Sequence, residues 1–313
     1  MNDNSNILIL DQNMVGSAIA RHLEENGYNN VYYPGKAEID LFDYKELKKY
    51  MTRIRPEYIF CFAGPHGGIK ANVEHPAEFI RENLIIQTNI IHCAYELSIK
   101  KMLFLAGSCV YPKSCPQPMM EKDYMTGVME ETSVAYSTAR VAGIEMCNAY
   151  NRQYHTNFVP VVMCNHYGEE DDFTENGHVL ASVMKKMLEA KQQNINELAL
   201  FGTGNPIREF MDIRDLAKAA VCIMNHYNST DLINIGGGTA VTIKELALKL
   251  ADIIGYSGEV TFDSRKPDGA YKKVCDGTKL KSLGFEPSIT FDQGITNLLT
   301  WYTKNSNSEI NLN

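Results

Sequence analysis

The chain has 313 residues, of which 44% are hydrophobic and 22% charged, a composition typical of a globular protein with a buried core. Its net charge of −8 argues against a nucleic-acid-binding protein, because a phosphate backbone requires clustered Lys and Arg. The sequence contains no long apolar run and no Cys-x-x-Cys pair among its eight cysteines, so we expect a cytoplasmic protein with reduced thiols, no membrane span and no metal site.

The first half of the sequence alternates short apolar runs with helical patterns. Strands are predicted at 7–10, 30–33, 58–62 and 101–105, and helices at 14–26, 44–53 and 76–98. A helix at 133–154 and a buried strand at 158–163 continue the alternation. Strands separated by helices in this order favour an α/β fold with a parallel, doubly wound sheet, which binds ligands at the carboxyl ends of its strands.

The second half of the sequence is less regular. Short strands are predicted at 198–201, 232–235 and 259–262, between helices at 179–191, 215–228, 242–254 and 290–304. This mixture predicts a smaller lobe that binds the substrate. We therefore expect residues 1–165 to form the sheet domain, with a later segment at about 202–240 returning to it, and residues 166–313 to form mainly the substrate lobe.

A set of motifs occurs in order along the chain and resembles the GDP-L-fucose synthase family. The motifs are GGIKAN (67–72), HPAEFIRENLIIQTNIIH (75–92), LFLAGSCVYP (103–112), YSTAR (136–140), AYNRQY (149–154), GTGNPIREFMDIRD (202–215), INIGGG (233–238) and SRKPDGAYKK (264–273). Members of that family are 3,5-epimerases and 4-reductases of GDP-4-keto-6-deoxymannose. The resemblance covers residues 7 to 303 and implies a Rossmann-like, extended short-chain dehydrogenase/reductase fold. It also implies a homodimer that pairs through helices at about 76–98 and 134–154.

The resemblance assigns the epimerising step to Cys109 in GSCVYP and His178 in ENGHVL. Carbons 3 and 5 of the sugar flank a ketone, so their protons can be removed if the enolate is stabilised. Inversion needs a base on one face and an acid on the other. A thiol and an imidazole suit both roles because they titrate near neutrality. Taken singly, a Cys after a strand is more often packing, and a His at a helix start is more often a cap.

The reducing set of the family is altered in this sequence. Tyr136 is present as the proton donor to the ketone, but Arg140 stands where the family has Lys, one helical turn later. A guanidinium supplies positive charge but does not simply replace a compact ammonium. The Ser that binds the ketone corresponds to Gly107, and the adjacent Ser108 is expected to point to the opposite side of the strand.

The cofactor loop also departs from the family pattern. The Gly-x-x-Gly-x-x-Gly motif reads LDQNMVG at 10–16, which leaves only Gly16, with Asn13 at the middle position. Asp11 places a carboxylate near the helix N-terminus, where a dinucleotide diphosphate would lie. One lysine, Lys36, follows the second strand to meet the extra phosphate of NADP. We therefore expect no bound NADP(H), or only weak binding.

The expected substrate pocket retains its motifs. A GDP-sugar is the expected ligand, and the resemblance assigns it to Asn165, Lys185, Lys186, Phe201, Arg208, Lys266 and Asp268. Arg208 suits a phosphate, and Phe201 offers a flat face for a nucleobase. For each charged residue the alternative is a solvated surface position, and the Lys-Pro-Asp-Gly sequence is also an ordinary turn.

Three hypotheses follow. The leading one is an epimerase that inverts carbon 3, carbon 5 or both of a GDP-4-keto-6-deoxyhexose or heptose, with reduction weak or lost and a separate reductase in the same pathway. The second is a bifunctional NADPH-dependent epimerase and reductase in which Ser108 and Arg140 compensate for the missing groups. The third is a noncatalytic subunit that binds a nucleotide sugar.

Overall fold

A computed structural model describes residues 1–11, 13–175, 177–266 and 268–305. Gln12, inside the expected cofactor loop, lies outside the described residues. The larger part of the molecule is built on a six-stranded parallel sheet in the order β2-β1-β3-β4-β5-β9. Its strands are β1 (Ile7–Leu10), β2 (Val31–Tyr32), β3 (Tyr58–Cys61), β4 (Lys101–Gly107), β5 (Phe158–Met163) and β9 (Ile233–Ile235). This arrangement confirms the predicted doubly wound α/β fold.

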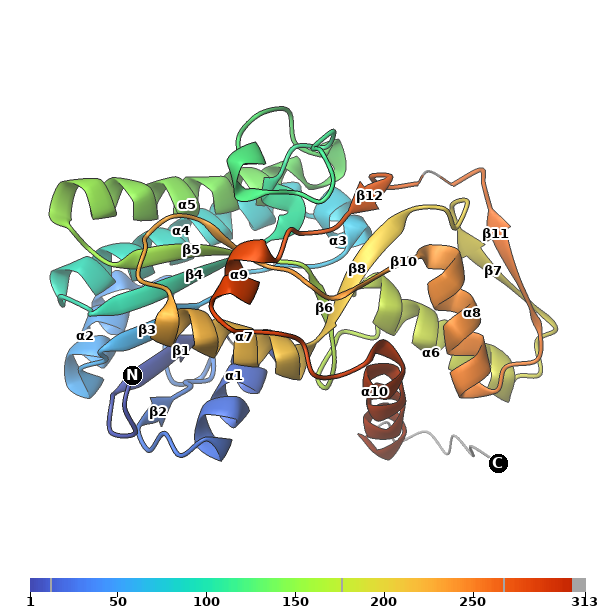
Figure 1. Ribbon diagram of the computed structural model, residues 1–313, viewed down its shortest axis with the longest axis horizontal. Helices are drawn as coiled ribbons and strands as arrows, with labels where there is room; N and C mark the ends of the chain where they lie inside the picture. Colours follow the sequence, from blue (N-terminus) through green and yellow to red (C-terminus); the bar gives the residue numbers. More distant parts are fainter. Residues whose placement is uncertain (12, 176, 267, 306–313) are drawn as a thin grey trace.

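Helices cover both faces of this sheet. One layer contains α1 (Met14–Glu25) and α7 (Ile213–His226), which pack against each other below the sheet in Figure 1. The other contains α2 (Tyr44–Ile54), α4 (Pro76–Glu96) and α5 (Val134–Tyr154). Because both faces are covered, the strands are apolar throughout rather than alternating: every residue of β1 and β5 is buried.

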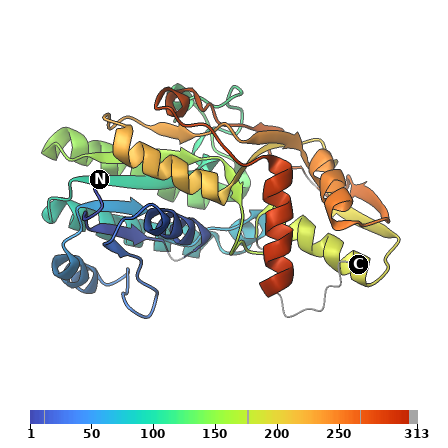
Figure 2. The ribbon, with the colours of Figure 1, turned by 60° about the horizontal axis from the view of Figure 1, so that its bottom comes forward.

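A smaller lobe lies at one end of the sheet, on the right in Figures 1 and 2. It contains β6 (Asn165–Tyr167), β8 (Ile207–Asp212), β10 (Thr239–Thr242) and β12 (Lys272–Lys273) in one sheet, and β7 (Glu197–Phe201) paired with β11 (Glu259–Asp263) in another. Its helices are α6 (Val179–Gln192), α8 (Ile243–Ile254) and α10 (Phe291–Asn305). These elements enclose a second hydrophobic cluster, separate from the core around the large sheet.

Two of the sequence motifs hold the lobe to the sheet. The buried carboxylate of Glu209, in β8, accepts hydrogen bonds from the backbone N–H groups of Gly237, Gly238 and Cys275 at 2.7–2.8 Å. Gly238 must be glycine, because a Cβ there would lie 2.5 Å from the backbone oxygen of Phe210. Burial raises the pKa of Glu209, while the three N–H groups act in the opposite direction. The REF and GGG motifs therefore have a structural role.

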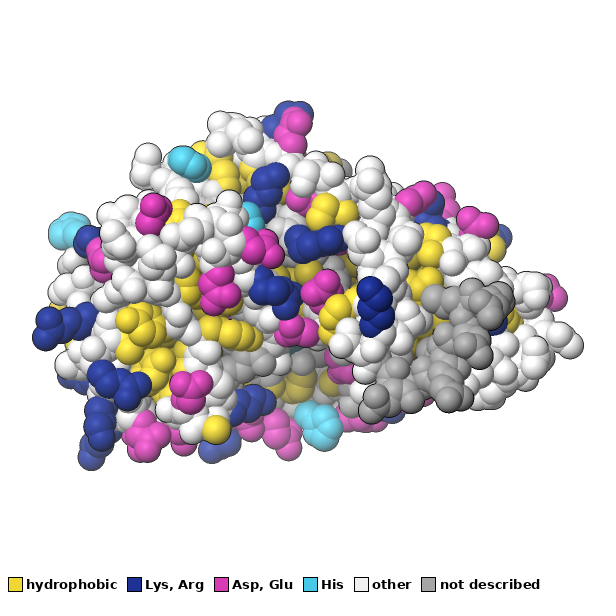
Figure 3. Space-filling model, turned by 90° about the horizontal axis from the view of Figure 1, so that it is seen from below, with side chains coloured by type: hydrophobic (Ala, Val, Ile, Leu, Met, Phe, Trp, Pro, Cys, Tyr) yellow, Lys and Arg dark blue, Asp and Glu magenta, His cyan; other side chains and the backbone are white. Residues whose placement is uncertain are grey.

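Four short strands and two short helices were not predicted. They are β6, β8, β10, β12, α3 (Ile69–Glu74) and α9 (Thr278–Ser282). Among the described residues, no helix is long and apolar enough to cross a membrane. On the face seen in Figure 3, Lys and Arg side chains are interspersed with Asp and Glu rather than gathered into one basic patch.

Candidate active site

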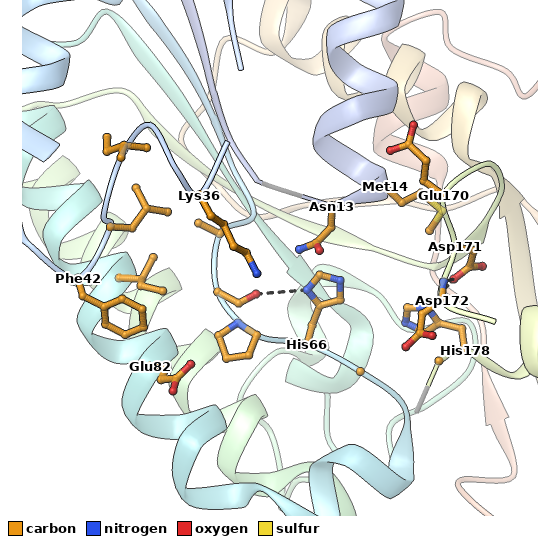
Figure 4. Close-up of a pocket in the computed structure, with 18 of the residues that line it drawn as sticks. Asn13, Met14, Lys36, Phe42, His66, Glu82, Glu170, Asp171, Asp172 and His178 are labelled. Carbon is orange, nitrogen blue, oxygen red and sulfur yellow. Dashed lines mark hydrogen bonds and ion pairs between the residues drawn. The ribbon is translucent and has the colours of Figure 1, made fainter. Parts of the chain in front are cut away.

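Two adjoining cavities lie where the carboxyl ends of the strands meet the smaller lobe. The larger, about 660 Å³, is lined by residues that follow β1, β2 and β3. The smaller, about 210 Å³, is lined by residues that follow β3, β4 and β5, by residues before and within β12, and by the start of α5. His66 and His178 line both. Figure 4 shows the larger cavity, with Asn13 and Lys36 pointing into it and His66 across from them.

The thiol of Cys109 reaches the smaller cavity because the chain changes conformation at the end of β4. A 3₁₀ turn at Ser108–Val110 follows Gly107 directly. Both Ser108 and Cys109 line the cavity as a result. Our expectation that Ser108 points away rested on the alternation of a strand, and that alternation does not continue through a helical turn. Cys109 packs against a small apolar cluster that includes Tyr136.

His178 lies at the N-cap position of α6, but its side chain makes no capping hydrogen bond. Its Nδ1 instead lies 3.6 Å from Oδ1 of the buried Asp171. Burial, the largest influence, would lower the pKa of His178, but the hydrogen bond and charge of Asp171 together raise it above its ordinary value. The imidazole is therefore held in the cavity and favoured in its protonated form, which is the form that an acid requires.

We predict that Asp171→Asn moves the alkaline limb of the exchange rate at carbons 3 and 5 to lower pH. Asp171 raises the pKa of His178, so its neutral replacement lets His178 lose its proton at lower pH. Exchange should slow at both pH values, by up to about tenfold at pH 8 and by a smaller factor at pH 6. The pH–rate profile measured by deuterium incorporation tests this. An unshifted profile with a uniformly lower rate would mean that Asp171 has only a structural role.

Tyr136 and Arg140 lie one turn apart on α5, as their spacing predicts. Arg140 is completely buried, and its Nε donates to Tyr136 Oη at 3.2 Å. Its Nη2 donates to the carbonyl oxygen of Ala63 at 3.1 Å, at the end of β3. Burial raises the pKa of Tyr136, while the charge of Arg140 lowers it. The guanidinium thus places a positive charge beside the tyrosine hydroxyl. Its hydrogen bond to Ala63 also connects α5 to a residue that lines the larger cavity.

Two histidines that the sequence analysis did not single out complete the smaller cavity. His66 Nδ1 lies 3.3 Å from Gly64 O, and its ring packs on Phe62. His166 Nδ1 lies 3.3 Å from Cys164 O, and its ring centroid is 5.6 Å from that of His178. Burial, helped by the neighbouring His178, lowers the pKa of His66 to about 4 and that of His166 to about 3. Both therefore stay neutral beside His178.

The larger cavity is lined by one cation and an apolar end, and also by the carboxylates of Asp40, Glu82, Glu170, Asp171 and Asp172. Lys36 is its only lysine or arginine among the described residues, and Ile39, Leu41 and Phe42 form an apolar end. Asn13, expected here, lines it in an extended conformation (φ −134°) and needs no left-handed backbone. Gly16 does not line this cavity. It allows α1 to approach the backbone at the end of β1, because a Cβ at this position would lie 2.4 Å from Asp11 O.

The carboxylate of Asp11 lies at the start of α1, as expected, but Asp11 does not line this cavity. Asp11 is buried, and its Oδ2 accepts a hydrogen bond from Gly16 N at 2.7 Å. It is absent from the residues that line the cavity. Burial raises its pKa to about 6, so part of its charge is lost below neutral pH. The side chain therefore accepts a hydrogen bond from a backbone N–H group in the first turn of α1, and it does not line the cavity.

The expected substrate residues fall into two groups. Asn165 and Arg208 line the smaller cavity, together with Lys273. Farther out, the Phe201 ring is 69% exposed, and the Nζ atoms of Lys186 and Lys266 lie 5.2 and 5.5 Å from its centroid. Such a flat ring flanked by two cations can receive a nucleobase and its phosphates.

Asp268 and Lys185 lie differently from the expectation. Asp268 accepts hydrogen bonds from Thr203 N and Oγ1 at 2.9 and 2.7 Å, which fixes the turn after Phe201. Lys185 lines neither cavity, and its Nζ lies 3.8 Å from Glu189 on the surface of α6. Lys185 is therefore not brought together with the other expected residues. Within the described residues, no three His, Cys, Asp or Glu side chains are arranged to hold a metal ion.

The chain is similar to proteins of known family. Residues 12–236 match the model of the NAD dependent epimerase/dehydratase family. The chain is 41% identical to a putative GDP-L-fucose synthase of Arabidopsis thaliana over 93% of this chain and 89% of that protein. Among solved structures, it is similar to a GDP-6-OMe-4-keto-L-xylo-heptose reductase from C. jejuni (TM-score 0.91, 31% identity, 97% of this chain and 99% of that one).

A further similar structure bears on the cofactor. It is a GDP-mannoheptose C4 reductase from Campylobacter jejuni, solved with NADP bound (TM-score 0.86, 31% identity, 97% of this chain and 99% of that one). This finding contradicts our expectation that NADP(H) is absent or weakly bound, and that expectation is wrong. The expectation took the loss of two glycines and the presence of Asp11 to block the site. In the structure Asp11 is buried against Gly16, and a cavity remains beside Lys36.

Proposed function

Because the chain belongs to the NAD dependent epimerase/dehydratase family, and within it to the GDP-L-fucose synthase family, we propose that it is an NADPH-dependent epimerase and reductase of a GDP-linked 4-keto sugar. The observation that carries the proposal is the convergence of Cys109, His178 and Tyr136 on one small cavity that adjoins a cavity suited to a dinucleotide. This corresponds to the second of our three hypotheses. It is favoured over loss of reduction, because both the cofactor cavity and the pairing of Tyr136 with a cation are retained.

In the epimerising step, the Cys109 thiolate removes the proton from the carbon beside the ketone. The electron pair of that C–H bond moves to the ketone oxygen, and the enolate is held by the Tyr136 hydroxyl. The protonated His178 then delivers a proton to the opposite face of the carbon, which inverts it. Asp171 keeps His178 charged for this step, and Arg140 holds the Tyr136 hydroxyl in position.

In the reducing step, NADPH held in the larger cavity beside Lys36 would supply a hydride to carbon 4 of the sugar. Tyr136 gives its hydroxyl proton to the ketone oxygen, and Arg140 Nε stabilises the resulting phenolate. Ser108 takes the position of a second donor in the same cavity. Arg208 and Lys273, farther along the cavity, are suited to the sugar diphosphate, and Phe201 with Lys186 and Lys266 to the nucleobase end.

We predict that Lys36→Ala weakens NADPH binding about 10- to 100-fold, the magnitude of one charge-assisted contact, while NADH binding changes little. Lys36 is the cation of the larger cavity among the described residues, and only NADPH carries the phosphate that it would meet. Calorimetric titration with each dinucleotide measures both constants. Lys45→Ala, an exposed lysine on the neighbouring α2, is the matched control. Equal weakening for both dinucleotides would place the NADP phosphate elsewhere.

The proposed activity is tested by incubating the protein with GDP-4-keto-6-deoxymannose and NADPH. We expect NADPH absorbance to fall and the sugar to become inverted at carbon 3 or 5 and reduced at carbon 4, as followed by NMR. Inversion without NADPH oxidation would instead support an epimerase that depends on a separate reductase. The absence of both changes would support a noncatalytic binding subunit.

A homodimer through α4 and α5 is part of the proposal. The outer face of these helices carries a cluster of aromatic rings, in which Tyr95 and Tyr154 stack at 4.2 Å and Tyr150 packs edge-on against both. Tyr154 is exposed, so a second copy of the chain would bury it. Light scattering of the purified protein measures its mass, which distinguishes a homodimer from a monomer.

A further inference from the structure

The smaller cavity contains an unusual set of hydrogen-bond acceptors. Asn72 Oδ1, Glu130 Oε2 and His166 Nε2 are buried and belong to residues that line it. Within the part of the chain that the structure describes, none of the three has a hydrogen-bond donor. Buried acceptors without donors are costly, so a cavity that keeps three of them is suited to a ligand that brings donors.

His166 presents an acceptor because its other ring nitrogen is already used. The residue is only 7% exposed, and its Nδ1 lies 3.3 Å from Cys164 O, a carbonyl that accepts and cannot donate. Nδ1 therefore carries the proton, and Nε2 of this neutral ring keeps a lone pair. Burial and the neighbouring His178 keep the ring neutral by lowering its pKa to about 3. Nε2 can consequently accept from a hydroxyl but cannot donate to a ketone.

The three acceptors lie on two sides of the cavity. Asn72, on α3, and Glu130, just before α5, come from the side that carries Tyr136; Asn72 is 7% exposed and the Glu130 side chain 12%. The carboxylate of Glu130 also interacts electrostatically with Arg208 and Lys273, the cations suited to the diphosphate on carbon 1. His166, on β6, lies instead against His178 on the other side.

This division matches the two sides of a 4-keto sugar. The hydroxyls on carbons 2 and 3 lie between the diphosphate and the ketone, whereas carbons 5 and 6 lie beyond the ketone. A 4-keto-6-deoxyhexose has only those two hydroxyls, and its carbon 6 is a methyl group. Asn72 and Glu130 can take the two ring hydroxyls, which leaves His166 without a donor if the sugar is 6-deoxygenated.

We propose that the sugar bound here carries a hydroxyl on carbon 6, as a hexose or heptose does, and that His166 Nε2 accepts a hydrogen bond from it. This inference rests on the proposed function and narrows its substrate class from GDP-linked 4-keto sugars to those that retain oxygen on carbon 6. A site built to pair with a hydroxyl discriminates strongly against the analogue that lacks it, because its own buried polar atom is then left unpaired.

The test compares two substrates, GDP-4-keto-6-deoxymannose and its counterpart with a hydroxyl on carbon 6, in the wild-type protein and in His166→Leu. We expect the wild type to have a kcat/KM about 10- to 100-fold higher for the hydroxylated sugar. His166→Leu should lose this preference, because kcat/KM falls for the hydroxylated sugar and stays nearly constant for the deoxy sugar. His166→Gln, which keeps an acceptor, should restore part of the preference.

Glu130→Gln is the matched control, since Glu130 would meet a ring hydroxyl that both sugars carry. It should lower kcat/KM for both sugars by the same factor. Equal turnover of the two sugars by the wild type, or an equal loss for both in His166→Leu, would overturn the inference and leave the proposed function intact. If the wild type turned over neither sugar and exchanged no deuterium into either, both the inference and the proposed function would fall.

Discussion

Replacing Cys109 by Ser is expected to slow deuterium exchange at carbons 3 and 5 of the sugar by at least about 100-fold, the contribution of a positioned general base. An alcohol is a much weaker acid than a thiol, so Ser at this position is far less able to form the anion that removes the carbon proton. The side chains are similar in size, so the fold should be retained. Reduction should continue, since Tyr136 and Arg140 are untouched, and it should yield a sugar that is not inverted.

The control for this variant is Cys222→Ser, which changes a partly buried cysteine on α7 that lines neither cavity. Its exchange rate should equal that of the wild type. NMR of the sugar in heavy water gives the exchange rate, and the configuration of the reduced product gives an independent readout. If Cys109→Ser exchanged at the wild-type rate, a base other than Cys109 would have to act.

Tyr136→Phe is expected to lower NADPH-dependent reduction by about 10²- to 10⁴-fold, because it removes the proton that the ketone oxygen must receive. It also removes the acceptor of the Arg140 Nε–H bond, which lies 3.2 Å from the hydroxyl in a fully buried position. Exchange at carbons 3 and 5 should slow less than reduction, since Ser108 lines the same cavity and can also donate to the enolate oxygen.

Absorbance of NADPH measures the reduction, and deuterium incorporation without NADPH measures the exchange. Tyr150→Phe serves as the control, because Tyr150 is on the same helix, its hydroxyl bonds to His92 at 2.8 Å, and it lines neither cavity. A Tyr136→Phe protein that oxidised NADPH at the wild-type rate would show that the proton comes from another group.

The large sheet could be predicted from sequence because its strands are apolar runs separated by long helices. The predicted strand at 7–10 and the predicted strand at 158–163 coincide with β1 and β5. The four strands β6, β8, β10 and β12 could not, because they mix polar with apolar residues. Their pairing depends on segments far apart in the sequence, and the local pattern does not contain that information.

The candidate site shows the same limit at the level of single side chains. Motif position selected Cys109, His178, Tyr136 and Arg140, which the structure brings close together, but strand alternation did not anticipate the helical turn that contains Ser108. His66 carried no signal of spacing or motif. His166 falls within a family-like Asn-x-Tyr-Gly segment that begins at Asn165, but only its position beside His178 in the smaller cavity singles it out.

The cofactor expectation failed for a related reason. The sequence shows that Asp11 lies within the loop that corresponds to the family's glycine pattern, and a carboxylate near a helix N-terminus is expected to compete with a diphosphate. It does not show that the carboxylate is buried at the start of α1, where it accepts a hydrogen bond from Gly16 N. A motif therefore predicts which residues surround a ligand better than it predicts the space left for that ligand.

The most direct test of this account is the wild-type protein with GDP-4-keto-6-deoxymannose in heavy water, before any NADPH is added. We expect deuterium to appear at carbon 3 or carbon 5 of the recovered sugar, because the Cys109 sulfur and the His178 imidazole share one cavity. Recovery of the sugar without deuterium at either carbon, from protein shown to bind it, would contradict the account.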